Sequence, residues 1–311
     1  METSIDFNLT DKSILNDCRC IVCDNEDVNT MSLKYKKENF VVVQCNKCSF
    51  LFVPQYFSKK ITYEDYKDEK VLEQIRQGNN WLKIQRHLLR FKLIKKYQPK
   101  GKLFDLGSGW GHFLYTGKQL GYEVSGIEIS NTAYEYATEE LKLPVEHINF
   151  FDMEIPQKAY DLITMWDVLE HIPDADEVIK RCNMMLKDGG YVVIQVPQID
   201  SFFAKKLQEN WHMISYGHVN YFSKETIKKL FEKYGFEVKK IKSSFEFKLF
   251  LMYVLGRNKK SEADRQEYFN KTAQKPMWML KIMVIGHDII YNIMSSLGIG
   301  DEMMVVAKKI R

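Results

Sequence analysis

The sequence predicts an α/β protein with a doubly wound, seven-stranded sheet. From about residue 100 onward, short apolar runs alternate with helical segments, the order that produces a parallel sheet with helices on both faces. The first run, 103–106, leads directly into glycines at 107, 109 and 111. With 311 residues, 45% of them hydrophobic, the chain can form one large domain and a smaller module.

The three glycines predict a ligand-binding loop. Gly107, Gly109 and Gly111 have no Cβ, so the backbone can turn tightly and approach a ligand closely. A helix that begins near Gly111 would point its free N–H groups at that ligand. The spacing is not the dinucleotide motif G-x-G-x-x-G, because His112 follows the third glycine.

The other strands are expected in order behind this loop. The second strand ends in Glu128, about 20 positions past the first glycine, where a carboxylate can hold ribose hydroxyls. Before the first strand, residues 70–97 are predicted to be helical, either packed on the domain or, in the first half, covering the ligand. A loop at 186–190 should precede the fifth strand. The strands are predicted at 122–127, 144–149, 160–166, 191–196, 236–241 and 302–307.

Two segments resemble class I S-adenosylmethionine (SAM) dependent methyltransferases. These are Asp105-Leu-Gly-Ser-Gly-Trp-Gly111, and Leu169-Glu-His171 with the following Pro173-Asp174. The resemblance implies a Rossmann-like methyltransferase domain with SAM as its cofactor. It implies that Asp152 contacts adenine, that residues 166–168 line the sulfonium, and that His171 is structural. The implied cofactor residues are Asp105, Gly107, Ser108, Gly109, Gly111, Phe113, Glu128, Ile129, Asp152, Met153, Trp166, Asp167, Val168 and His171.

The N-terminal residues predict a zinc ribbon. Cys20-x2-Cys23 and Cys45-x2-Cys48 are two pairs that together can complete a tetrahedral four-thiolate zinc site. Cys18 is an alternative to Cys20 as ligand. A closed four-thiolate site has no open position, so this zinc is expected to be structural. The predicted organisation is a ribbon at 1–55, a helical linker at 56–100 and a methyltransferase domain at 101–311.

The segment 197–221 follows the fifth strand and is expected to contact the methyl acceptor. His218 is the first candidate for a general base and His212 the second. Tyr216-Gly-His-Val-Asn-Tyr-Phe-Ser223 resembles a branch with N-terminal zinc modules that includes deoxysugar C-methyltransferases and surface-polysaccharide enzymes. C-methylating members have Glu where this chain has Gly217. The sequence therefore favours O-methylation of a sugar, glycan precursor or related small hydroxylated metabolite over C-methylation of a nucleotide-linked deoxysugar.

Charge and hydropathy define the remaining alternatives. A net charge of +4 gives no footprint of a nucleic-acid binder, so RNA methylation is a weaker hypothesis. A non-catalytic SAM-binding scaffold is another. The first residues lack a signal-peptide pattern, which predicts a cytoplasmic protein. A long insertion, 244–300, is expected to pack on the domain or on a second subunit of a homodimer. Alternatively it rests on the cytoplasmic face of a membrane or contacts a lipid-linked acceptor.

Overall fold

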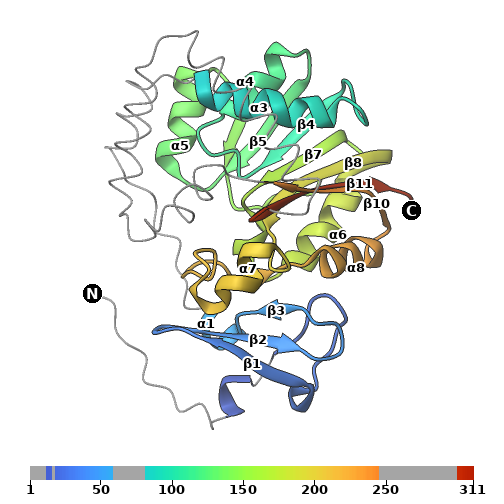
Figure 1. The fold of residues 1–311 in the computed structure, drawn as a ribbon. Coiled ribbons are helices and arrows are strands. Elements are labelled where there is room, and N and C mark those ends of the chain that lie inside the picture. The colour runs from blue at the N-terminus through green and yellow to red at the C-terminus, as the bar shows by residue number, and fades with distance from the viewer. Residues whose placement is uncertain (1–11, 16–17, 59–80, 245–299) are drawn as a thin grey trace.

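A computed structural model describes residues 12–15, 18–58, 81–244 and 300–311 (Figure 1). Within these residues the strands form one seven-stranded and one four-stranded sheet. The large sheet has the order β10-β11-β8-β7-β4-β5-β6. Its strands are β4 (Lys102–Leu106), β5 (Glu123–Glu128), β6 (Val145–His147), β7 (Tyr160–Trp166), β8 (Leu186–Pro197), β10 (Phe236–Ser244) and β11 (Glu302–Lys309).

The large sheet is doubly wound, as predicted. Strands β6, β5, β4, β7 and β8 pair in parallel, and β11 inserts antiparallel between β8 and β10. The carboxyl ends of the parallel strands and the start of β11 therefore share one edge. Helices cover both faces (Figure 1): α3 (Trp81–Ile94), α4 (His112–Gln119) and α5 (Asn131–Glu135) lie on one, and α6 (Ala175–Met185) and α8 (Lys224–Lys233) on the other.

The central strand β4 is apolar because it is covered on both faces. Leu103, Phe104 and Leu106 are all buried. On one side, α3 packs against α4 through the rings of Phe91 and Phe113, which stack with centroids 4.5 Å apart. The helix predicted at 70–97 is confirmed for its described part, while 59–80 lies outside the described residues.

The strand β8 begins earlier than predicted. It starts at Leu186, immediately after α6, so 186–190 is strand and not the expected loop. Tyr160 of β7 pairs with Leu186 of β8. Leu162, two residues further along β7, already pairs with Tyr191. A bulge therefore absorbs the extra residues of β8, and Gly189 has a positive φ of 76° there. The insertion predicted at 244–300 lies almost entirely outside the described residues.

The small sheet combines three N-terminal strands with one strand from much later in the chain. Its N-terminal strands are β1 (Met31–Lys36), β2 (Val41–Cys45) and β3 (Leu51–Phe52), all antiparallel. The fourth strand is β9 (Asn220–Tyr221), which pairs with β3. We call residues 18–58 the ribbon module. Its sheet is thus completed by the segment that follows β8.

Short elements complete the described chain. They include a π-helical turn that continues α5, and several 3₁₀ turns. Among the described residues, no helix combines the length and the hydropathy needed to cross a bilayer. The short elements are 3₁₀ turns at Lys12–Leu15, Val28–Thr30, Leu169–His171 and Gln208–Asn210, the π turn Tyr136–Glu140, α1 (Gln55–Ser58) and α7 (Phe202–Leu207).

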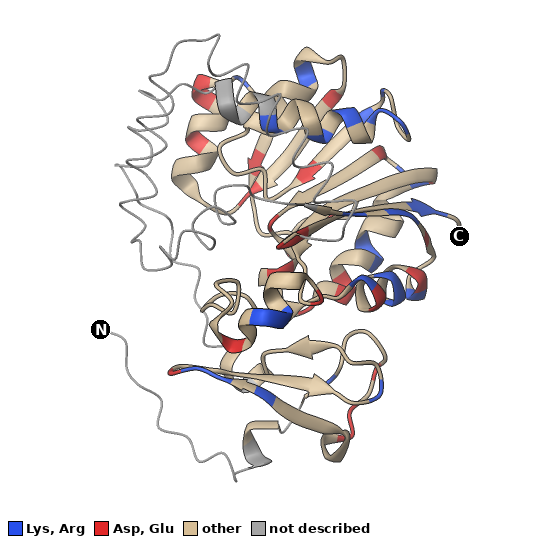
Figure 2. Cartoon of the chain, viewed as in Figure 1, with Lys and Arg blue, Asp and Glu red and all other residues tan. Residues whose placement is uncertain are grey.

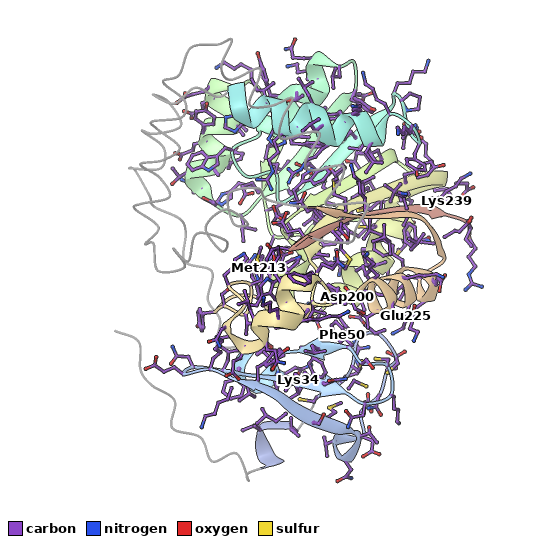
Figure 3. The ribbon with its side chains drawn as sticks, in the orientation of Figure 1. Lys34, Phe50, Asp200, Met213, Glu225 and Lys239 are labelled. Carbon is purple, nitrogen blue, oxygen red and sulfur yellow. The ribbon has the colours of Figure 1, made fainter. Side chains whose placement is uncertain are left out.

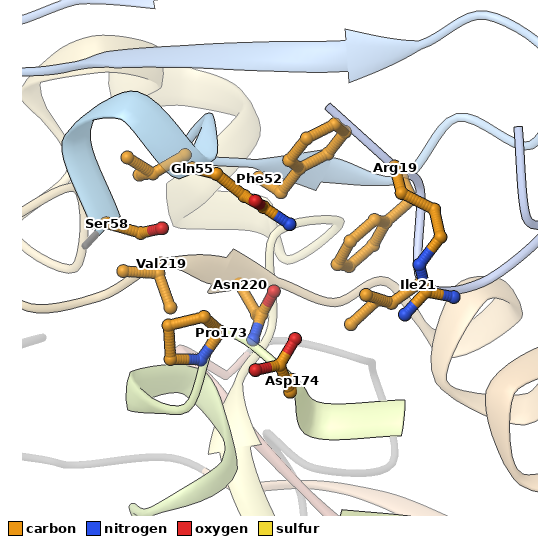
Figure 4. A pocket seen from close by; sticks show the side chains of 11 residues that line it. Arg19, Ile21, Phe52, Gln55, Ser58, Pro173, Asp174, Val219 and Asn220 are labelled. Atoms are coloured by element: carbon orange, nitrogen blue, oxygen red, sulfur yellow. The ribbon is translucent and has the colours of Figure 1, made fainter. Parts of the chain in front are cut away.

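The ribbon module docks beneath α6 and α8 (Figure 1). Arg19 donates to Asp176 of α6 at 2.6 Å, and Lys233 at the end of α8 donates to Asp24 at 2.7 Å. A small pocket lies at this junction, where Asp174 and Asn220 face Phe52 of the ribbon (Figure 4). The pairing of β3 with β9 and these ion pairs fix the module against the larger sheet. The domain boundaries themselves remain predictions.

Candidate functional site

The three loop glycines have different neighbours. All have positive φ: 70° at Gly107, 52° at Gly109 and 74° at Gly111. A Cβ on Gly107 would lie 2.8 Å from Val168, and one on Gly111 would lie 2.6 Å from Leu143. A Cβ on Gly109 would meet nothing within 4 Å. Packing therefore requires the outer two glycines, whereas the middle one borders open space.

Glu128 closes this space from the end of β5. The residue is only 8% exposed, and its Oε2 accepts a hydrogen bond from Gly109 N at 2.6 Å. Oε1 accepts from Ser130 N at 2.8 Å, and Ser130 also caps α5. Ser108 Oγ is buried without a hydrogen-bond partner among the described residues. A fixed carboxylate, a buried hydroxyl and an open glycine fit the ribose end of a nucleoside, as predicted for SAM.

The predicted adenine contacts lie farther along the same edge. Asp152 is exposed and Met153 half-buried, in the loop after β6. Ile129 is 52% exposed beside Glu128. Their contacts with the cofactor stay predictions.

Asp105 lies buried near the end of β4. Its Oδ1 accepts a hydrogen bond from Thr164 Oγ1 of β7 at 2.5 Å. Burial raises the pKa of Asp105 to about 8, against the opposing effects of this hydrogen bond and of Arg90. The structure therefore places this predicted cofactor residue beneath the loop, in the sheet.

Sequence reasoning missed Arg90, which α3 inserts at the same edge. Arg90 is 6% exposed, and it donates to Gln195 Oε1 at 3.1 Å. Its Nη2 is 3.8 Å from Asp167, and Gln195 in turn donates to Asp167 at 3.1 Å and to Glu302 at 2.7 Å. Burial lowers the pKa of Arg90 to about 10, so it remains charged at pH 7. The sequence signal that could have indicated its burial is its position four residues before Ile94, on the apolar face of the helix.

Arg90 also covers the ring of Trp166, which was predicted to face the sulfonium. Its guanidinium carbon lies 4.0 Å from the centroid of Trp166. Phe113 packs against the same ring with centroids 4.8 Å apart. The cation that the structure shows over Trp166 is thus Arg90, and the assignment of Trp166 to the sulfonium stays a prediction.

The aromatic rings of the segment 197–221 are divided between the core and the surface. Trp211 is buried and donates from Nε1 to Asp301 at 2.8 Å. Tyr221 is also buried, within β9. Phe202 and Tyr216 remain exposed, at 51% and 57%. Phe203 is buried as well, so three of the five rings belong to the core between the sheet and the ribbon module and hold the segment in place.

Of the two predicted bases, His218 is half-buried. Its Nδ1 donates to the carbonyl oxygen of Met213 at 2.9 Å; Met213, labelled in Figure 3, lies between the large sheet and the ribbon module. Burial, and next the neighbouring His171, lower the pKa of His218 to about 4, so its ring is neutral at pH 7. His212, by contrast, is exposed and packs against Trp211.

His218 meets the turn that follows β7. The rings of His171 and His218 are 4.6 Å apart, in a T-shaped arrangement. His171 Nδ1 donates to the carbonyl oxygen of Gly217 at 3.0 Å, and burial lowers the pKa of His171. Glu170 is 1% exposed beside them, and burial, together with Asp167, raises its pKa. Sequence reasoning did not single out Glu170.

The four predicted cysteine ligands meet in the ribbon module. Cys20 and Cys48 have their sulfurs 3.4 Å apart, and Cys23 and Cys45 3.7 Å apart. Sulfurs about 2.3 Å from one zinc ion in a tetrahedron are about 3.8 Å apart, whereas a disulfide requires about 2.05 Å. The spacing therefore fits a tetrahedral metal site. Cys18 is buried but is not part of this four-sulfur group.

Comparison with known proteins concerns the part of the chain that forms the large sheet, and the family match does not include the four cysteines. Residues 77–241 match the family model described as "Methyltransferase domain". A SAM-dependent methyltransferase from Archaeoglobus fulgidus has a similar fold, with a TM-score of 0.51 and 21% identity over 78% of this chain and 100% of that one. At this level of identity the likeness shows a shared fold and nothing more.

Curated relatives match a shorter stretch. The ubiquinone biosynthesis O-methyltransferase of Proteus mirabilis is 32% identical over 98 residues, 29% of this chain and 40% of the relative. The protein of the same name in Coxiella burnetii is 33% identical over 109 residues, 33% of this chain and 47% of the relative. The chain thus spans less than half the length of these relatives.

Proposed function

Because this chain belongs to the methyltransferase-domain family, we propose that it methylates an oxygen atom of a sugar, glycan precursor or related small hydroxylated metabolite, with SAM as donor. The observation that supports SAM most directly is the contact between Glu128 and Gly109. A buried carboxylate at the end of the second parallel strand faces a glycine with open space beside it. This is where an open α/β sheet binds a nucleoside.

Oxygen as the methyl acceptor is supported by the curated relatives, which are named as O-methyltransferases. A sugar acceptor is supported by the segment around His218, which resembles enzymes of surface-polysaccharide clusters. Gly217 disfavours C-methylation, since C-methylating members have Glu at this position. Its φ of 99° favours glycine there, and its carbonyl holds His171.

The chain's own residues would position the two reactants. When bound, SAM supplies a methyl group on a sulfonium sulfur that keeps the electron pair of the broken bond. Glu128 would hold the ribose, and the backbone at Gly109 would allow close approach. His218 lies at the same edge as the loop, with Nδ1–H committed to Met213, so its Nε2 carries the lone pair. In the simplest mechanism, this nitrogen takes the proton of the acceptor hydroxyl as the methyl group transfers.

RNA methylation is the main alternative of a different class. Lys and Arg are interspersed with Asp and Glu over the described elements (Figure 2). Along α8, for example, Lys228 pairs with Glu232 and Lys229 with Glu225. A surface of such mixed charge does not favour binding of the phosphate backbone of RNA. We therefore propose a small or glycan acceptor.

We also propose that Cys20, Cys23, Cys45 and Cys48 hold one structural zinc ion. The four sulfur atoms all lie within 4.8 Å of one another, so four thiolates would repel each other and need a cation to be stable together. The ion would supply most of the folding free energy of a module this small.

Methyl transfer to a panel of acceptors tests the proposed function. The full chain would be incubated with SAM and nucleotide sugars, lipid-linked sugars or total RNA, and products read by mass spectrometry. We expect one added methyl group on a sugar hydroxyl, located by fragmentation. His218→Ala should lower the rate by about 100-fold, the low end of the range for a general base, because burial lowers the pKa of His218 to about 4 and makes it a weak base. A methylated RNA, or a methyl group on carbon, would contradict the proposal.

A further inference from the structure

Three side chains that can bind a metal converge near the predicted cofactor residues, and one of them, His171, is itself among those residues. Glu170 and His171 lie in the turn after β7, and His218 comes from the segment before β9. Their ligand atoms all lie within 4.8 Å of one another. We propose that Glu170, His171 and His218 bind a divalent cation, which in turn binds the oxygen atom to be methylated. The role of the cation rests on the proposed function, whereas the site itself does not.

Both imidazoles are oriented as metal ligands usually are. His171 Nδ1 donates to Gly217 O at 3.0 Å, and His218 Nδ1 donates to Met213 O at 2.9 Å. A histidine that binds a metal commonly donates its other ring N–H to a carbonyl or carboxylate, which fixes the tautomer. In both rings the Nε2 atom therefore carries the lone pair, and His171 Nε2 is 3.9 Å from Glu170 Oε1.

Glu170 supplies the negative charge. Its Oε2 is buried and has no hydrogen-bond partner among the described residues. A buried carboxylate must be paired, bind a cation or take up a proton. Two ligand atoms on opposite sides of a cation, each about 2.1 Å from it, are about 4.2 Å apart. The ligand atoms here lie within 4.8 Å of one another, so a small inward shift of the three side chains would accommodate the ion.

Backbone contacts bring the two segments together. Val219 N donates to Glu170 O at 2.8 Å, and Asn220 Nδ2 donates to Ile172 O at 2.7 Å. The same turn reaches the glycine loop, because Val168 contacts Gly107. A cation here would thus lie on the acceptor side of the cofactor loop.

Two imidazoles and one carboxylate suit divalent ions such as Mn²⁺, Fe²⁺ or Zn²⁺ and leave positions open for other ligands. A hydroxyl bound to such an ion has a lower pKa than a free one. His218 would then be a ligand and not the base, so the proton of the hydroxyl would leave to water. The methyl group would still move from sulfur to oxygen, with the sulfur keeping the electron pair.

Titration with Mn²⁺, followed by the electron paramagnetic resonance signal of free Mn²⁺, tests the site directly. The full chain would first receive one equivalent of zinc, which the four thiolates bind in preference to imidazole and carboxylate, so that the second site stays open to Mn²⁺. We expect one Mn²⁺ site in the wild type. Glu170→Gln and His218→Ala should each weaken binding at least tenfold, whereas His212→Ala, in the same segment, should bind Mn²⁺ like the wild type.

Thermal melting separates loss of the site from loss of the fold. Glu170→Gln keeps the shape of the side chain and should melt cooperatively without metal, and only the wild type and His212→Ala should gain stability from Mn²⁺. Equal Mn²⁺ affinity in the wild type and a folded Glu170→Gln would overturn the inference, even if methyl transfer occurred. Tight Mn²⁺ binding lost in Glu170→Gln would support the cation site, even if no panel acceptor were methylated.

Discussion

Single residues at the end of β4 decide whether the cofactor can approach the backbone. Gly107 and Gly111 are required by their neighbours Val168 and Leu143. Only Gly109 combines positive φ with an open side and with an N–H held by Glu128. Packing thus requires two of the alternate glycines, and the third, Gly109, is the one at which cofactor binding is predicted.

Gly109→Ala should lose SAM affinity while keeping the fold. Left-handed backbone costs a residue with a Cβ about 1–2 kcal/mol, and no atom opposes the new methyl group. We expect a SAM dissociation constant at least tenfold higher by calorimetry, with a small change in the free energy of unfolding. Gly111→Ala is the matched comparison, since its methyl group meets Leu143 and Ala137 and should destabilise by about 3 kcal/mol. Wild-type SAM affinity in Gly109→Ala would contradict the binding role.

At the scale of elements, α3 is tied to the large sheet by a buried charge. Arg90 lies between the Trp166 ring and the polar side chains of Asp167 and Gln195. Arg86, one turn earlier, is 54% exposed and only reaches Asp167 and Glu302 at 4.0 Å. The helix thus carries two arginines toward the same acids, one buried and one in solvent.

Arg90→Ala should destabilise the protein much more than Arg86→Ala. Removing Arg90 leaves Oε1 of the buried Gln195 without its donor, which typically costs about 1–3 kcal/mol, and also removes the guanidinium that packs on Trp166. An exposed ion pair contributes about 0–1 kcal/mol. Urea unfolding of both variants beside the wild type measures the difference. Similar losses for the two would mean that burial does not govern this network.

At the scale of the whole molecule, the ribbon module and the segment 197–221 share one sheet. β9 pairs with β3, and Val53 N donates to Val219 O at 2.9 Å, next to His218. Phe50 of the module, labelled in Figure 3, packs on Phe222 with centroids 5.2 Å apart. The four-sulfur group of the module therefore supports the position of His218 through a strand, without contacting it.

Loss of zinc should disturb the segment around His218. Cys45→Ser should lower the zinc content, measured by mass spectrometry of the metal, by one equivalent per chain. Hydrogen exchange should then speed up at residues 219–222, because β9 loses its partner strand. Cys18→Ser is the control and should retain zinc, since Cys18 is not in the four-sulfur group. Unchanged exchange at 219–222 in zinc-free Cys45→Ser would refute this coupling.

The sequence alone determined the features that depend on local spacing. Apolar runs located the strands, alternate glycines located the loop before α4, and two Cys-x2-Cys pairs predicted the four-sulfur group. Spacing also placed Glu128 one strand beyond the loop, because neighbouring parallel strands end at the same edge. The predicted start of β8 was wrong, because a bulge against β7 extends the strand back through the two glycines to Leu186.

Only the tertiary structure decided the contacts between distant segments. No local pattern indicates that β9 completes the ribbon sheet, since a two-residue strand has no periodicity of its own. Arg90 is buried because the sheet offers Asp167 and Gln195, and Glu170 meets His218 because the chain folds back beneath β7. Such contacts depend on how elements pack, and packing joins residues that sequence spacing does not relate.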